Sequence, residues 1–116
     1  MEHKDLIIGL YQCAAACNAC FEACLLEPDV AHLERCMKLD KECYDVCKLT
    51  AHHLERESDH MHLFLSVCIK ICNDCADECE KHSHEHCIKC AEACRRCLQE
   101  CEAIQSWGHL EILEVI

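Results

Sequence analysis

Residues that favour turns, and large aromatic side chains, are scarce in this chain. Its 116 residues include two glycines and one proline, and Phe, Trp and Tyr together make up 4%. A sheet protein needs many turns, where glycine and proline are preferred, and strands rich in aromatic and β-branched residues. Abundant Ala, Leu, Glu and Lys favour helix instead. The composition therefore predicts an all-α protein with one modest core.

Positive charge and long apolar runs are also limited. The chain has 11 Lys and Arg residues against 22 Asp and Glu residues, which gives a net charge of −11 at pH 7. Nucleic-acid binding requires clustered positive side chains, so the composition excludes this partner. No apolar run approaches membrane-spanning length by inspection, and the start "MEHKDLIIGLYQC" lacks the basic and long apolar regions of a signal peptide. We therefore expect a cytoplasmic protein with no membrane partner.

Cysteine is abundant, with 16 residues. In a reducing compartment so many thiols indicate metal ligands or redox groups rather than disulfides. Most lie three or four residues apart, which in a helix separates their Cβ atoms by ~5–6 Å. A disulfide needs about 3.5–4.5 Å, whereas two metal–sulfur bonds of ~2.3 Å span the helical gap. The spacing therefore favours metal binding.

Four segments carry the cysteines, and each has the periodicity of a helix. The predicted helices run from about 5 to 26, 30 to 56, 60 to 80 and 84 to 104. Their expected N-terminal capping residues are Asp29, Ser58 or Asp59, and Ser83. The thiols that continue each helix's apolar line are Cys13, Cys17, Cys20, Cys24, Cys36, Cys43, Cys47, Cys68, Cys72, Cys75, Cys79, Cys87, Cys90, Cys94, Cys97 and Cys101.

Short connections between these segments make consecutive helices antiparallel neighbours. The expected fold is an antiparallel up-down-up-down four-helix bundle with a cysteine-lined core, formed by residues 1–106. Residues 107–116 are predicted to be a separate C-terminal tail, which is apolar and has few helix signals after Gly108. The sequence leaves open whether this tail packs on the end of the bundle or on another subunit.

This topology gives the two ends of the bundle different compositions. One end, named the histidine end, gathers Cys24, His32, Cys79, His82, His84, His86 and Cys87. The opposite end, named the leucine end, gathers Leu6, Leu10, Leu54, Met61, Leu65 and Ile104, with Trp107 as a further candidate. We therefore expect metal ligands at one end and an apolar closure at the other.

Four polar side chains near the thiols have open roles. His82, His84 and His86 are candidate peripheral metal ligands, although alternating histidines before a helix are also typical of a polar turn. Asp40 interrupts the cysteine line of the second helix, and we expect it to point to solvent. The histidines expected to be simple solvated turn residues are His52, His53, His60 and His62.

The number of thiols decides which metal is favoured. Packing alone is a poor explanation, because each cysteine is smaller than leucine and would leave the core loosely filled. Thiolates select Cu(I), Zn(II) or iron–sulfur clusters. Four zinc ions shared among 16 thiolates leave eight negative charges uncompensated in the core, which is costly, whereas one monovalent ion per thiolate leaves it nearly neutral. Multiple Cu(I) ions are therefore favoured, with a zinc or mixed-metal buffer and a C-x-x-C redox protein as alternatives.

Three stretches resemble a known family. "CNACFEAC", "LERCMKLDKECYDVC" and "CNDCADECEKHSHEHCIKCAEACRRC" are similar to copper storage proteins, over roughly residues 11–104. The resemblance implies Cu(I) storage by the 16 cysteines inside a bundle, without catalysis, in the cytosol and often as a homotetramer. It also implies a peripheral role for the "HSHEH" histidines. The second helix carries three cysteines, so metal is expected to be sparser there.

Overall fold

The fold was analysed in a computed structural model that describes the backbone of residues 3–115 and the side chains of residues 3–105. Residues 3–115 form four α-helices and one short 3₁₀ helix, and they contain no strand. The elements are α1 (Lys4–Leu25), η1 (Val30–Leu33), α2 (Glu34–Glu55), α3 (Met61–Cys79) and α4 (Glu85–Val115). The prediction of an all-α protein is confirmed.

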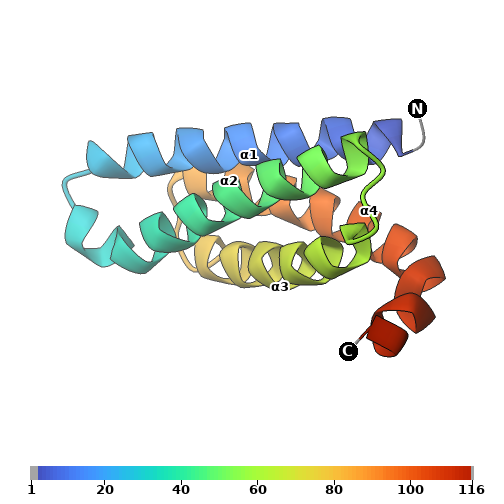
Figure 1. Ribbon diagram of the computed structural model, residues 1–116. Helices are drawn as coiled ribbons and strands as arrows, with labels where there is room; N and C mark the ends of the chain where they lie inside the picture. The colour runs from blue at the N-terminus through green and yellow to red at the C-terminus, as the bar shows by residue number, and fades with distance from the viewer. Residues whose placement is uncertain (1–2, 116) are drawn as a thin grey trace.

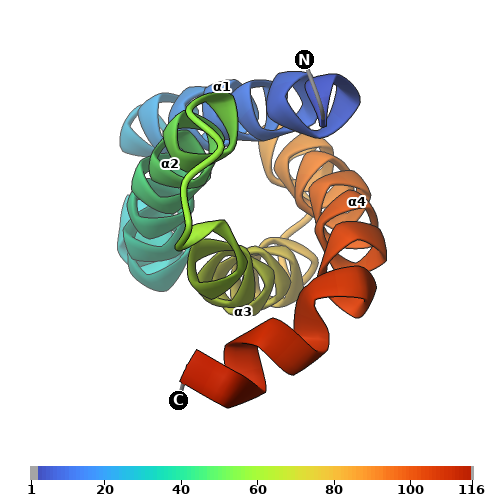
Figure 2. The same cartoon turned by 45° about the vertical axis from the view of Figure 1, so that its right-hand side comes forward.

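The four helices form an antiparallel ring, as Figures 1 and 2 show. Each helix packs against two neighbours: α1 and α3 both contact α2 and α4. Short connections reverse the chain after α1, α2 and α3, so the ring closes between the first and the last helix. This arrangement is the predicted up-down-up-down bundle, and it directs one face of every helix toward a common axis.

The connections differ in detail from the predicted caps. Asp29 precedes η1 without a side-chain capping hydrogen bond, and its carboxylate instead accepts from His84 at 3.1 Å. The prediction of Asp29 as the cap of the second helix is therefore wrong, because His84, in the connection between α3 and α4, lies within reach of its carboxylate. Ser58 does support its turn, since its hydroxyl oxygen accepts from the backbone N–H of His60 at 3.0 Å.

The fourth helix is longer than predicted. Its backbone stays helical to Val115, past Gly108, and it extends beyond the other helices in Figure 1. A single glycine costs a helix only ~1 kcal/mol, and the residues that follow it include no proline. The side chains of residues 106–116 lie outside the described part, and so does the expected contact of Trp107 with the leucine end.

The leucine end is closed by apolar side chains as expected. Leu6, Leu10, Leu54 and Leu65 are buried there, and the partly buried side chains of Met61 and Ile104 pack against the same core. Apolar burial of this kind is the main favourable contribution to folding. It gives the bundle a packed core that does not depend on the thiols.

By length and composition alone, α1 is apolar enough to span a membrane. Its best 18-residue window has a mean hydropathy of 1.3, so the expectation that no apolar run approaches this length is wrong. Core helices of soluble proteins and signal sequences near an N-terminus pass the same test. In this bundle the face of α1 that carries Cys13, Cys17, Cys20 and Cys24 is buried against the other helices. Packing within the bundle therefore accounts for this face of α1, while Ile8 and Leu25 of the same helix are exposed.

The leucine end should keep the reduced, metal-free chain folded. Because Leu10 is fully buried, Leu10→Ala should lower the free energy of unfolding by about 2–5 kcal/mol. Leu26→Ala, at a position that is 86% exposed, is the matched control and should change it by less than about 0.5 kcal/mol. Urea unfolding followed by circular dichroism measures both. A reduced metal-free chain without a helical signal would contradict this account.

Candidate metal centre

All sixteen cysteines point into the bundle as free thiols. None of these residues is more than 1% exposed, and together they occupy most of the positions that line the axis between the two ends. The sequence placed them on the apolar line of each helix, so the periodicity alone located them correctly. The core is therefore a continuous array of sulfur enclosed by helix backbone.

Neighbouring sulfur atoms are in contact along and between the helices. Four of the pairs that lie four residues apart on one helix have Sγ–Sγ distances of 3.8–3.9 Å: Cys20–Cys24, Cys43–Cys47, Cys68–Cys72 and Cys97–Cys101. Between helices, Cys36 of α2 lies 3.4 Å from Cys79 of α3. Within each connected set, a metal ion bound to one thiol therefore has the next sulfur within 4 Å, and Asp40 lies between Cys36 and Cys79 of the histidine end and Cys75 and Cys90 of the inner part.

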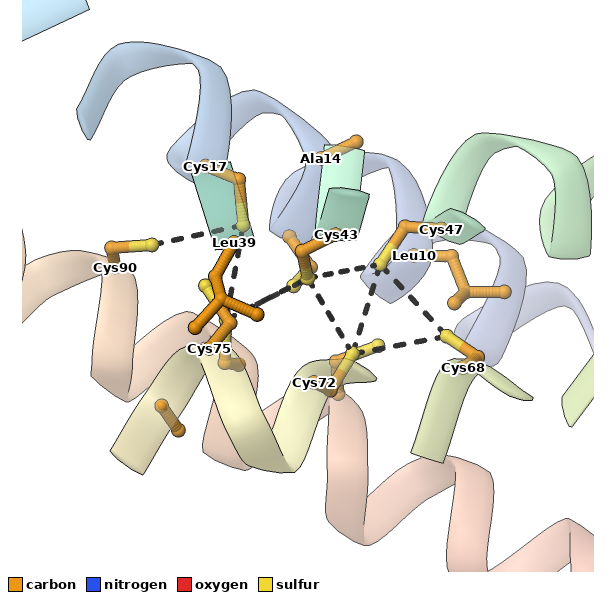
Figure 3. Packing of buried hydrophobic residues seen from close by; sticks show 14 of the residues in the cluster. Leu10, Ala14, Cys17, Leu39, Cys43, Cys47, Cys68, Cys72, Cys75 and Cys90 are labelled. Atoms are coloured by element: carbon orange, nitrogen blue, oxygen red, sulfur yellow. Dashed lines mark hydrogen bonds between the residues drawn. The ribbon is translucent and has the colours of Figure 1, made fainter. Parts of the chain in front are cut away.

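Three triads of thiols are closed, with every sulfur in contact with the other two. Figure 3 shows two that share an edge. They are Cys43–Cys47–Cys72, Cys47–Cys68–Cys72 and Cys13–Cys43–Cys94, with edges of 3.7–3.9 Å. In the first, whose edges are 3.7–3.8 Å, the centre lies about 2.2 Å from each sulfur (edge divided by √3). This is close to a metal–thiolate bond of ~2.3 Å.

Groups of four ligand atoms also converge in the core. In each group the atoms lie within 4.8 Å of one another. They include Cys13–Cys47–Cys72–Cys97, Cys13–Cys17–Cys43–Cys94, Cys17–Cys75–Cys90–Cys94, Cys20–Asp40–Cys79–Cys90 and Cys20–Cys24–His86–Cys87. Several thiols belong to more than one group, so the array offers overlapping rather than isolated sites.

Asp40 is buried in the array, and the expectation that it points to solvent is wrong. It has no exposed surface, and its Oδ1 lies 3.3 Å from the Cys90 sulfur and 3.4 Å from the Cys75 sulfur. Burial, together with the negative charge of neighbouring thiolates such as that of Cys90, raises the pKa of Asp40 far above its usual range. A carboxyl group held in this way is protonated at neutral pH. Its place on the Cys36–Cys43 line was the signal that located it.

His86 is the predicted histidine that the structure brings to the thiols. Its Nδ1 lies 3.5 Å from the sulfur of Cys87, 3.6 Å from that of Cys20 and 3.8 Å from that of Cys24. Its Nε2 is buried without a hydrogen bond and faces Glu27 at 3.6 Å. The four residues form a Cys₃His group at the histidine end, where an imidazole nitrogen and three sulfurs face one point.

His82 and His84 face carboxylates rather than thiols. His82 Nε2 lies 3.0 Å from Glu78, and His84 lies 3.0 Å from Glu27 and 3.1 Å from Asp29. The hydrogen bond to Asp29 raises the pKa of His84. The ring of His84 stacks on that of His86, with centroids 5.2 Å apart. His84 therefore lies beside the Cys₃His group, whereas His82 is held by Glu78, and sequence reasoning missed the acidic partners of both.

The thiols of the histidine end differ in acidity. Hydrogen bonds from Cys36 and Cys79 lower the pKa of Cys20 to about 6. Burial raises the pKa values of Cys24 and Cys87. Among these three thiols, Cys20 therefore gives up its proton most readily. Since the thiolate is the form that binds metal, it is suited to make the first bond.

Comparison with known proteins identifies the family. The model of the copper storage protein family matches residues 1–106. An uncharacterized cysteine-rich protein of Bacillus subtilis, YhjQ, is 43% identical over 79 residues, which cover 68% of this chain and 73% of that protein.

Solved structures agree in fold and sequence. The Cu(I)-bound copper storage protein BsCsp3 has a TM-score of 0.85 and 38% identity, covering 89% of this chain and 97% of that one. A cytosolic copper storage protein from Streptomyces lividans, carrying five coppers, has a TM-score of 0.85 and 43% identity. The match covers 87% of this chain and 89% of that one. With a family match across most of its length, this chain belongs to the copper storage protein family.

Proposed function

We propose that the protein stores multiple Cu(I) ions on its core thiolates and does not catalyse a reaction. The observation that carries this proposal is the continuous inward array of sixteen free thiols. Soft thiolates prefer Cu(I) among cellular metals, and a monovalent ion neutralises the array nearly one for one. The proteins with similar structures that are described as loaded with copper support the same cargo.

Uptake begins at the histidine end. Cu(I) first meets the Cys20 thiolate, with Cys24, Cys87 and the His86 nitrogen in reach. It then moves inward by exchanging ligands, first from Cys87 to Cys36 across 3.9 Å. Each new copper–sulfur bond releases a thiol proton, so copper affinity falls as the solution becomes more acidic.

Asp40 takes the place of a thiol on the α2 wall. Its carboxyl oxygens lie near four thiols, including Cys36 at 3.9 Å and Cys79 at 3.7 Å. As these thiols lose protons to copper, the positive ions next to the carboxyl group favour its ionised form. Asp40 then compensates positive charge where α2 lacks a cysteine.

We further propose that the protein works in the cytoplasm and as a homo-oligomer, a tetramer by family resemblance. The cytosolic copper storage protein from Streptomyces lividans supports the location by its similarity. Analytical ultracentrifugation of the metal-free and loaded forms tests the assembly, and a monomer in both forms would exclude it.

Zinc binding at the histidine end is a second candidate. Three cysteines and one histidine, as in Cys20–Cys24–His86–Cys87, form a common ligand set for structural zinc. A C-x-x-C redox activity has less support, because all sixteen thiols are buried away from a protein substrate. Direct competition between zinc and Cu(I) for the metal-free protein separates the first two functions.

Copper capacity is the central prediction of storage. Anaerobic titration with Cu(I) against a competing chelator should load well over four ions per chain, because each Cu(I) needs only two or three sulfurs, whereas four tetrahedral zinc sites without shared sulfurs use all 16 thiolates. A parallel zinc titration is the control and should saturate at four or fewer. Saturation at one or two Cu(I) ions would rule out storage.

His86 should control the rate of uptake. His86→Ala removes the nitrogen that faces three sulfurs, so stopped-flow mixing should show copper loading slowed several-fold with most of the capacity kept. His82→Ala is the matched control, because His82 contacts Glu78 rather than a thiol. Equal slowing in both variants would argue against a specific role of His86.

Asp40 should make the metal-free protein less stable as the pH rises. Its pKa is raised in the folded state above the reference value of 3.8, so the folded chain holds a proton that the unfolded chain releases. Between pH 5 and pH 7, the free energy of unfolding of the wild type should fall by up to about 1.4 kcal/mol per pH unit relative to that of Asp40→Asn. Urea unfolding of both reduced proteins measures this. Parallel pH profiles would contradict a buried, protonated carboxyl group.

A further inference from the structure

We propose that the inner thiol triads bind arsenite, the trivalent oxyacid of arsenic, as neutral tris-thiolate complexes. This inference rests on the proposed function in one respect, since both require reduced core thiols that a small solute can reach. Arsenite binding differs from copper storage in the charge and the coordination number of the bound species. It therefore assigns the bundle a second class of ligand.

Two of the closed triads share no residue. Cys47 of α2 joins Cys68 and Cys72 of α3, with Sγ–Sγ distances of 3.9, 3.8 and 3.8 Å. The other triad draws one thiol from each of three helices, with distances of 3.9, 3.8 and 3.9 Å: Cys13, Cys43 and Cys94. The bundle therefore offers two separate three-sulfur sites.

The chemistry of arsenite matches three neighbouring thiols. As(OH)₃ reacts with three S–H groups to give As(SR)₃ and three water molecules. Three As–O and three S–H bonds break, three As–S and three O–H bonds form, and no electron is transferred. Arsenic keeps its lone pair and needs no fourth ligand, so a closed triad completes its coordination.

Charge balance also favours this ligand in a dry core. When all three sulfurs carry protons, arsenite and the thiols are neutral before the reaction, and the complex and the released water are neutral after it. Hydrogen bonds from neighbouring thiols lower the pKa values of Cys13 and Cys68. A sulfur that is already a thiolate is balanced by one proton taken from solution, so the complex is again neutral. Burial of an uncompensated charge is costly, and this reaction creates none. The carboxyl group of Asp40 does not enter these two triads, since the thiols near it are Cys20, Cys36, Cys75, Cys79 and Cys90. Sulfur alone therefore forms each site.

The test is an oxygen-free titration of the reduced, metal-free protein with sodium arsenite. Native mass spectrometry should show two arsenic atoms retained per chain, one for each separate triad. X-ray absorption at the arsenic edge should show three sulfur neighbours and no oxygen. Absence of retained arsenic, or arsenic that keeps oxygen neighbours, would overturn the proposal.

Two matched variants locate the sites. Cys72→Ser breaks both triads that contain Cys47, so it should retain one arsenic per chain. Cys101→Ser removes a fully buried thiol whose recorded partner is Cys97 at 3.9 Å, and it should retain two. Cys94→Ser breaks the triad Cys13–Cys43–Cys94 and should also retain one arsenic per chain. It serves as the test variant if Cys72→Ser does not fold. Equal losses in Cys101→Ser and the triad variants would contradict the assignment.

A copper titration of the same preparation separates this inference from the proposed function. Normal Cu(I) capacity without retained arsenic overturns the arsenite sites and leaves copper storage standing. Retained arsenic with a copper capacity of one or two ions supports the arsenite sites and overturns copper storage. Prior saturation with Cu(I) should abolish arsenic binding, because the same sulfurs are then occupied.

Discussion

The burial of sixteen thiols along one axis is the constraint on which the rest of the structure depends. A thiol fills less space than a leucine side chain and adds less apolar area, so a core of sulfur stabilises the fold weakly. The bundle compensates at the leucine end, where Leu10, Leu54 and Leu65 are fully buried. Stability and metal binding are thus assigned to different parts of the same axis.

The two ends of the bundle also differ in whether they offer polar groups to an incoming metal ion. At the histidine end, His86 and the acidic Cys20 face Cys24 and Cys87, and the carboxylates of Glu27 and Asp29 hold His84 beside them. The leucine end has no comparable set among the described side chains and is sealed by apolar contacts. This difference supports the proposal that copper enters at the histidine end and moves inward by ligand exchange among the buried thiols.

Most of the architecture could be predicted because it depends on local spacing. Thiols three and four residues apart mark one helix face, and short connections determine the antiparallel order. Asp40, Asp29 and the length of α4 could not be predicted in the same way. A buried carboxyl group is unfavourable alone, and the thiols of α3 and α4, together with Cys36 of its own helix, make it tolerable. Asp29 likewise pairs with His84, a partner distant in sequence, and the capping preference of a residue type does not predict such contacts.

The most direct test of the central claim is a crystal structure of the copper-loaded protein with anomalous scattering measured at the copper edge. The account predicts many copper peaks along the bundle axis, each bonded to two or three cysteine sulfurs, with one near His86. Copper confined to surface histidines, or core thiols joined as disulfides, would contradict it.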